Sequence, residues 1–174
     1  MRPAFHEYFM GVAIAVRERA NCVGQKVGAV LVLDSRVVST GYNGTPEDMP
    51  NCEAGGCQRC KDREKYGSGQ AYDLCICLHA EQNALVSAAR FGIRIERGVM
   101  YTTTQPCFNC LKEMVQGGIG GVYYLHGWQP KELEFRQQYE ILQARISGGL
   151  TQLQMDDPRK DWALARRNDL PQKP

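Results

Sequence analysis

The chain is constrained most by a His-x-Glu motif and a Pro-Cys-x-x-Cys motif that follows it. The imidazole of His79 and the thiolates of Cys107 and Cys110 are three ligands that suit Zn²⁺ and leave its fourth tetrahedral position open for water. Glu81 lies two residues after the histidine, where a carboxylate can move protons to and from that water. Each motif alone is a weak signal, but the two in this order predict a catalytic zinc site.

The same residues have a second interpretation, a closed structural zinc site made of His79 and three cysteines. The cysteines outside the second motif are available as the extra ligand. A closed site has no use for the carboxylate of Glu81, and this residue therefore favours the catalytic interpretation.

Length and composition place the chain among ordinary globular proteins. With 174 residues, 43% of them hydrophobic, 23% charged and a net charge of +2, we expect one domain with its own core. A dedicated nucleic-acid-binding protein would carry a dominant basic stripe, so no nucleic-acid partner is expected. No apolar run approaches the roughly 18 residues of a membrane span, and the polar N-terminus does not resemble a signal peptide. We therefore expect a cytoplasmic protein with no membrane partner.

Eight cysteines in such a chain require an explanation. A disulfide scaffold is typical of small secreted chains that lack a core, whereas in a reducing compartment this spacing favours metal ligands. Many of the cysteines lie in or just after a long irregular segment, and a loop this long is usually functional or pinned. Metal cross-links would explain how so few apolar residues order so much chain. We predict a cysteine-rich zinc loop over about residues 47–78.

Hydrophobic periodicity predicts alternating helices and strands, and hence an α/β fold with helices packed on the faces of a sheet. The expected helices cover residues 5–19, 81–91, 106–117 and 131–146, and the expected strands cover residues 27–33, 36–41, 99–103, 122–125 and 150–155. The expected core face of the first helix comprises Phe5, Tyr8, Phe9, Val12, Ile14 and Ala15. We predict a domain over residues 1–155 and a charged tail over residues 156–174, the last few of them mobile.

Both zinc-binding motifs are expected at helix N-termini that follow strands or loops. The positive end of a helix dipole favours a thiolate, which lowers the cost of deprotonating Cys107. From spacing alone, Asn43-Gly44 is interpreted as a turn after the second strand.

The pattern of residues resembles the cytidine and deoxycytidylate deaminase superfamily, whose zinc enzymes carry the His-x-Glu and Pro-Cys-x-x-Cys signature. Other segments resemble the deoxycytidylate (dCMP) deaminase branch, namely residues 27–30 (VGAV), 41–46 (GYNGTP), 51–60 (NCEAGGCQRC) and 73–77 (DLCIC). The likeness runs from about Phe5 to Trp128.

The resemblance implies a three-layer α/β/α cytidine-deaminase-like fold with a central mixed sheet of about five strands. It implies hydrolytic deamination of dCMP to dUMP and ammonia, which supplies dUMP for thymidylate synthesis. In that mechanism a zinc-bound hydroxide attacks C4 of the cytosine, and Glu81 protonates the ring nitrogen and later the departing amine. It also implies a homo-oligomer, a hexamer or a dimer, with dCTP and dTTP as possible allosteric ligands.

By position, the resemblance assigns Asn43 a hydrogen bond to the substrate sugar, in place of a role in the turn alone. Trp128 falls where the family usually has a tyrosine stacked on the base, and it keeps the aromatic face without the hydroxyl. His126-Gly127 also departs from the common pattern, which leaves fine substrate preference and effector response open. Lys26 and Arg90 are candidates for phosphate, effector or subunit contacts, against the simpler interpretation of exposed or interface charges.

The resemblance also implies a second, structural zinc. Its expected ligands are Cys22, Cys52, Cys57 and Cys75, with Cys60 and Cys77 as alternates. Six cysteines exceed one tetrahedral site, and the sequence leaves open which two are spare.

Other functions use part of the same pattern. A tRNA adenosine deaminase shares both motifs, but its RNA partner favours a basic surface that a net charge of +2 does not provide. A free-cytidine or riboflavin-pathway deaminase gives no reason for the cysteine-rich loop. From a different class, a zinc-stabilised module that binds nucleotides without turnover would not need Glu81.

Overall fold

The computed structural model describes residues 2–66 and 71–164. In these residues five strands form one mixed sheet in the order β2-β1-β3-β4-β5. The strands are β1 (Gly28–Leu33), β2 (Arg36–Tyr42), β3 (Val99–Thr104), β4 (Gly121–His126) and β5 (Leu150–Gln152). β1 pairs antiparallel with β2 and β3, while β3, β4 and β5 are parallel to one another. The predicted mixed sheet of about five strands is confirmed.

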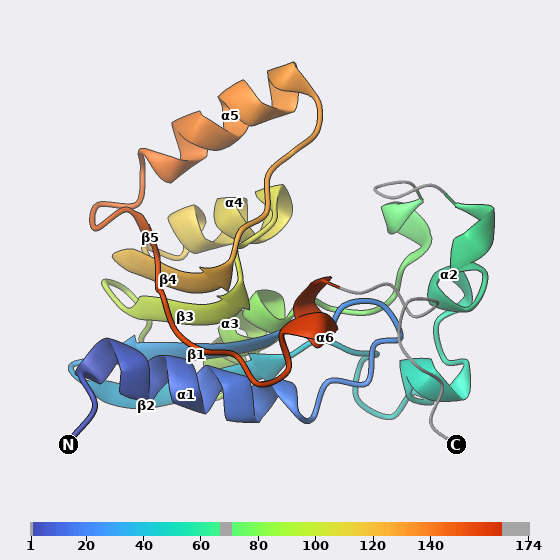
Figure 1. Ribbon diagram of the computed structural model, residues 1–174, viewed down its shortest axis with the longest axis horizontal. Helices are drawn as coiled ribbons and strands as arrows, with labels where there is room; N and C mark the ends of the chain where they lie inside the picture. Colours follow the sequence, from blue (N-terminus) through green and yellow to red (C-terminus); the bar gives the residue numbers. More distant parts are fainter. Residues whose placement is uncertain (1, 67–70, 165–174) are drawn as a thin grey trace.

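Helices cover both faces of this sheet. The helices are α1 (Phe5–Arg17), α2 (Gln58–Lys61), α3 (Ala80–Arg90), α4 (Phe108–Gln116), α5 (Leu133–Gln143) and α6 (Lys160–Leu164). Figure 1 shows α1 in front of the sheet, α3 behind it, and α5 beyond α4. The predicted α/β/α layering is confirmed. No helix in the described ranges is both long enough and apolar enough to cross a membrane.

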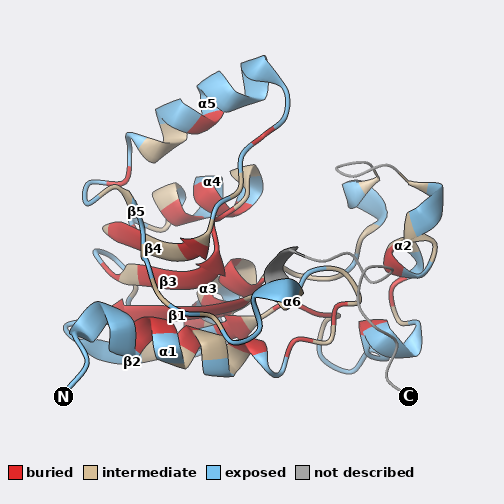
Figure 2. Ribbon diagram, in the orientation of Figure 1, coloured by how far each residue is buried: buried red, intermediate tan, exposed pale blue. Residues whose placement is uncertain are grey.

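Strand β1 contributes side chains to two cores because successive residues point to opposite faces of a sheet. Ala29 and Leu31 pack in the cluster that includes residues of α3 and α4. Val30 and Val32 pack in a second cluster with residues of α1. Figure 2 accordingly shows the centre of the sheet as buried.

The buried face of α1 differs from the prediction. Phe5 and Tyr8 are 57% and 52% exposed and Ala15 is exposed too, so these three positions of the predicted core face were wrong. The buried residues of the helix are Phe9, Met10, Ala13 and Arg17. The spacing of apolar residues did not identify this face of the helix, because one of its buried positions holds the charged residue Arg17.

Arg17 is buried because its guanidinium is paired with Asp157. Nη1 and Nη2 of Arg17 donate to the two carboxylate oxygens at 2.8 and 2.6 Å. His126 Nε2 lies 2.7 Å from Oδ2 of the same carboxylate. Burial alone would raise the pKa of Asp157, but the hydrogen bonds from Arg17 and His126 outweigh it and hold the pKa below the ordinary range.

The described part of the predicted tail therefore packs on the domain. Asp157 contacts α1 and β4, and the backbone N–H of Lys26 donates to the carbonyl of Trp162 at 3.0 Å. The boundary between residues 155 and 156 stays a prediction. The expected mobility of the last residues falls on 165–174, outside the described residues.

Asp157→Asn should lower the free energy of unfolding near neutral pH by roughly 3–5 kcal/mol, because it leaves a buried guanidinium without its counter-charge. The depressed pKa means that this contribution is complete above the ordinary aspartate pKa of about 3.9 and is lost as the pH falls below it. Denaturant titrations of both proteins at several pH values measure the difference.

Glu18→Gln is the matched control, because Glu18 pairs with Arg159 at 3.0 Å where both side chains are 41–49% exposed. An exposed pair of this kind contributes less than about 1 kcal/mol. A loss in Asp157→Asn no larger than that of the control would contradict the role assigned to the buried pair.

Candidate active site

Two helix N-termini carry the residues of the two motifs. His79 is the N-cap of α3 and Cys107 is the N-cap of α4, which follows the carboxyl end of β3. Backbone N–H groups at a helix N-terminus stabilise negative charge. The fold therefore places the thiolate of Cys107 where the sequence predicts it.

The structure brings His79, Cys107 and Cys110 together as three potential metal ligands. His79 Nδ1 lies 3.3 Å from Cys107 Sγ and 3.4 Å from Cys110 Sγ, and the two sulfur atoms are 3.5 Å apart. A tetrahedral zinc with ordinary bond lengths requires about 3.5 Å between nitrogen and sulfur and about 3.8 Å between two sulfurs. The donor atoms and their spacing fit Zn²⁺ with one position left open.

The charges in this triad favour a cation between the thiolates and the imidazole. Contact with Cys107 raises the pKa of His79 to about 9. The hydrogen bond with Cys110 lowers the pKa of Cys107 to about 4, and the same contact raises the pKa of the buried Cys110 thiol. A metal ion replaces the protons that these groups otherwise hold.

Glu81 lies beside the triad without belonging to it. Its side chain is 4% exposed, and it is absent from the group of three possible ligands. Burial raises the pKa of Glu81 to about 7, although the positive charge of His79 acts in the opposite direction. A carboxyl group with this pKa can accept and release a proton near neutral pH.

Residues that sequence reasoning missed hold the start of α3 in place. Gln82 accepts a hydrogen bond from the backbone N–H of His79 at 3.0 Å and donates to Glu113 at 2.9 Å. A glutamine three residues after the N-cap is a capping-box signal, so the sequence could have shown this contact. Gly41 on β2 allows α3 to approach, because a Cβ there would lie 2.1 Å from the carbonyl oxygen of Ala80.

Asn43 is buried and its amide is held by the backbone. Its Oδ1 accepts from the N–H of Val27 at 2.8 Å, and its Nδ2 donates to the carbonyl of Gln25 at 2.7 Å. Gly44 bridges to Leu78, the residue before His79, so Asn43 lies next to the segment that enters the site. The predicted bond from Asn43 to a sugar stays a prediction.

Trp128 is tied to the Cys107 loop by contacts that the sequence did not indicate. Its backbone N–H donates to Gln105 Oε1 at 3.2 Å, and its ring packs edge-on against Tyr139 with centroids 5.5 Å apart. The hydroxyl of Tyr139 donates to the carbonyl of Pro106 at 2.5 Å. These contacts join the segment after β4, helix α5 and the segment before α4. The residues are far apart in the sequence, so no local sequence pattern predicts that they meet.

Lys26 and Arg90 have partners within the chain. The ammonium of Lys26 stands 4.8 Å from the centre of the Trp162 ring. Arg90 pairs with Glu47 on the surface, where the two side chains are 64% and 70% exposed. Their predicted contacts with phosphate, effector or subunit stay predictions.

Five cysteines of the cysteine-rich loop and Cys22, which follows α1, are divided by the structure differently from the predicted set. The first sulfur group is Cys22, Cys52, Cys60 and Cys77, and the second sulfur group is Cys57, Cys60, Cys75 and Cys77. The predicted combination is not one group, because Cys22 and Cys52 belong only to the first group and Cys57 and Cys75 only to the second. The two alternates, Cys60 and Cys77, belong to both groups. All eight cysteines of the chain are free, and the disulfide alternative has no support in the structure.

Comparison with known sequences gives the family. The model of the cytidine and deoxycytidylate deaminase zinc-binding region matches residues 3–126. The chain belongs to this family. It is similar to the deoxycytidylate deaminase of Saccharomyces cerevisiae, with 41% identity over 136 residues, or 78% of this chain. It is 38% identical over 139 residues to the deoxycytidylate deaminase of Mycobacterium phage D29, a match that covers 75% of this chain.

The relatives differ in length. The match covers 98% of the phage protein but only 42% of the yeast protein. Among solved structures, the dCMP deaminase of the cyanophage S-TIM5 in complex with dCMP and dUMP aligns with a TM-score of 0.65 and 27% identity. That alignment covers 88% of this chain and 99% of the cyanophage chain.

Cys107→Ser should leave the purified protein with one zinc ion fewer per chain than the wild type, because two remaining ligands hold zinc weakly. Glu81→Gln should retain the wild-type zinc content, since Glu81 lies outside the ligand group. Elemental analysis after dialysis measures both. Equal zinc in Cys107→Ser and wild type, or a loss in Glu81→Gln, would contradict the assignment of the ligands.

Proposed function

We propose that this chain catalyses the hydrolytic deamination of dCMP, in which water is consumed and dUMP and ammonia are released. Such a reaction supplies dUMP for thymidylate synthesis. The observation that carries the proposal is the buried Glu81 carboxyl beside a histidine–dicysteine triad that leaves one zinc position open. The relatives named deoxycytidylate deaminase, and the cyanophage enzyme in complex with dCMP and dUMP, support the choice of substrate.

Three side chains would hold the catalytic zinc, namely His79, Cys107 and Cys110. When bound, zinc would supply Lewis-acid activation of a water molecule. Glu81 takes a proton from that water at its carboxylate and delivers it to the ring nitrogen. It then takes the second proton of the former water from the hydroxyl group on C4 and delivers it to the amine, which departs as ammonia while the C4 carbonyl forms. Because burial brings its pKa to about 7, Glu81 can perform both proton acceptance and donation in one cycle.

Asn43 and Trp128 are the proposed substrate contacts. The backbone contacts of Asn43 use its carbonyl oxygen and one amide hydrogen, which leaves the second hydrogen of Nδ2 for a sugar hydroxyl. Trp128 offers an aromatic face for the base, and its packing against Tyr139 fixes the orientation of the ring.

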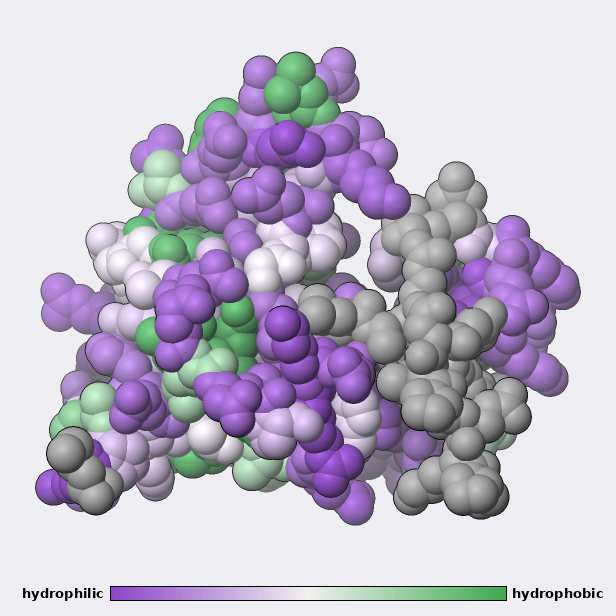
Figure 3. Space-filling model, in the orientation of Figure 1, coloured by the Kyte–Doolittle hydropathy of each residue, from purple (hydrophilic) through white to green (hydrophobic). Residues whose placement is uncertain are grey.

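Assembly and regulation are further parts of the proposal. Apolar side chains on the outer surface support a homo-oligomer, a hexamer or a dimer. Val86 and Phe91 at α3 are 56% and 69% exposed, and Leu133 and Phe135 on α5 are 67% and 58% exposed. Figure 3 shows an apolar patch over α5. We propose dCTP and dTTP as allosteric ligands and the cytoplasm as the location, since a reducing compartment keeps ligand thiols free.

The cysteine-rich loop supports a structural zinc in addition to the catalytic one. Each of the two sulfur groups offers four thiols whose sulfur atoms lie within 4.8 Å of one another. Four thiolates are a common ligand set for structural zinc.

Glu81→Gln should lower the turnover of dCMP by about 100-fold to 10,000-fold, because an amide cannot carry the proton. The assay follows the loss of cytosine absorbance with dCMP, cytidine, deoxycytidine and dCTP as substrates. Glu18→Gln, a surface change far from the triad in sequence and outside its contacts, should keep wild-type turnover. Absence of turnover on all four compounds by the wild type would exclude the proposed reaction and favour a non-catalytic nucleotide-binding module.

Arg90→Glu should weaken assembly, or the response of turnover to dCTP and dTTP, by several-fold, because we propose that Arg90 contacts a neighbouring subunit or an effector phosphate. Glu47→Gln is the control, since it removes only the intrachain partner of Arg90. Sedimentation and turnover with added nucleotide measure the two effects. Unchanged assembly and unchanged nucleotide response in Arg90→Glu would exclude this role.

A further inference from the structure

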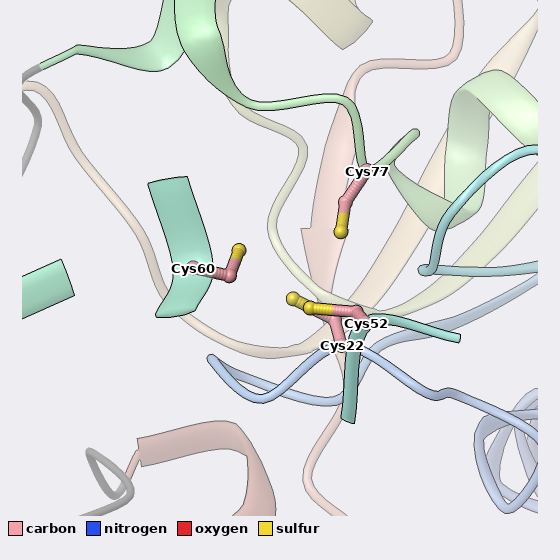
Figure 4. Close-up of side chains that lie close together, drawn as sticks. All are labelled: Cys22, Cys52, Cys60 and Cys77. Carbon is pink, nitrogen blue, oxygen red and sulfur yellow. The ribbon is translucent and has the colours of Figure 1, made fainter. Parts of the chain in front are cut away.

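The six cysteines outside the active site form two overlapping sulfur groups rather than one site with two spare thiols. Cys60 and Cys77 belong to both groups, while the other four cysteines each belong to one. Figure 4 shows the sulfur atoms of the first group directed toward a shared centre. The overlap is therefore confined to one residue of α2 and one residue just before His79.

The sulfur spacing in the second group fits a metal ion and excludes a disulfide. Cys75 Sγ lies 3.8 Å from Cys57 Sγ and 3.8 Å from Cys60 Sγ. Tetrahedral zinc with zinc–sulfur bonds of about 2.3 Å places two sulfurs about 3.8 Å apart, whereas a disulfide bond is about 2.0 Å long. These two sulfur–sulfur distances thus match the edge length of a zinc coordination tetrahedron, with the sulfur atoms at its corners.

Backbone donors in the first group face sulfur atoms. The N–H of Gly24 points to Cys22 Sγ at 3.4 Å, and the N–H of Val23 points to Cys52 Sγ at 3.5 Å. A thiolate accepts such hydrogen bonds better than a thiol, because charge strengthens the bond. Arg63 adds a cation nearby by donating to the carbonyl of Val23 at 2.7 Å.

In the described part of the loop, few apolar side chains other than cysteines are buried. The buried members of its own cluster are all cysteines, Cys22, Cys52, Cys57 and Cys60. Its large apolar side chains, Met49, Tyr72, Leu74 and Ile76, are between 38% and 52% exposed. Ordering a segment of this length by burial of six small thiols is unfavourable, whereas metal–thiolate bonds contribute folding energy directly.

We propose that the six cysteines bind two zinc ions in a binuclear zinc–thiolate cluster in which Cys60 and Cys77 bridge both ions. Two tetrahedral ions require eight ligand positions, and six sulfurs fill them when two sulfurs are shared. Two Zn²⁺ with six thiolates carry the same net charge as one Zn²⁺ with four thiolates and two neutral thiols. The second ion therefore adds no net charge to the loop.

The cluster connects to the active site through the chain. Bridging residue Cys77 lies two positions before His79, and the residue between that pair, Leu78, exchanges two backbone hydrogen bonds with Gly44 at 2.9 and 3.2 Å. The cluster is thus a positioning element for the segment that enters α3. Its existence is independent of the reaction proposed for the active site.

Zinc content of three proteins separates one ion from two. We expect three zinc ions per wild-type chain, one of them in the active-site triad. Cys22→Ser and Cys57→Ser should each contain one ion fewer, because each removes a terminal ligand from a different group. A single four-cysteine site predicts two ions in the wild type, with one of the two variants unaffected. Two ions in the wild type would overturn the binuclear cluster but agree with a single structural zinc. One ion per wild-type chain would overturn both the binuclear cluster and the single structural zinc.

Cadmium NMR of the wild type tests the sharing of sulfur without any variant, so it stands even if the variants do not fold. In protein loaded with ¹¹³Cd, we expect two resonances from all-thiolate sites that are split by coupling to each other through the bridging sulfurs. A single all-thiolate resonance, or two without mutual coupling, would overturn the proposal. The resonance of the triad, with its nitrogen ligand, serves as the internal reference.

Discussion

The meeting of two helix N-termini beside a buried carboxylate is the constraint on which the rest of the structure depends. α3 presents His79 and Glu81, and α4 presents Cys107. The helix N-termini favour the negative charge of the Glu81 carboxylate and of the Cys107 thiolate, while His79 binds metal as a neutral imidazole. The sheet makes this meeting possible, since Gly41 lets α3 lie close against β2 and the end of β3 leads into α4. Burial of Glu81 then gives a carboxyl group a pKa suited to moving protons.

The cysteine-rich loop, which the proposed zinc cluster orders, leads directly to His79 in the active site. The buried members of the loop's own cluster are all cysteines. Because Cys77 immediately precedes the Leu78–Gly44 bridge, the loop continues directly into His79 at the start of α3. Stability of the loop and placement of His79 are thus physically linked through the backbone.

Features that depend on residues close together in the sequence were predicted, whereas contacts between residues far apart in the sequence were not. His79 and Glu81 could be predicted as site residues because they lie within one local motif, and so could Cys107 and Cys110. The strands over residues 27–33 and 36–41 were predicted from local sequence for the same reason. The buried pair of Arg17 and Asp157 joins residues 140 positions apart, and no periodic pattern records it. The division of the cysteines likewise depends on how three separate loops meet. Trp128 was predicted as a substrate contact by resemblance, but its attachment through Gln105 and Tyr139 required the fold.

The source of the oxygen atom in the product tests the central claim most directly. The protein is incubated with dCMP in water enriched in ¹⁸O, and the nucleotide product is analysed by mass spectrometry. An activated water at the open zinc position predicts dUMP that carries one ¹⁸O atom on the base at C4, with ammonia released in equal amount. Unchanged dCMP, or a product without the label, would contradict the assignment of the triad and Glu81 to hydrolytic deamination.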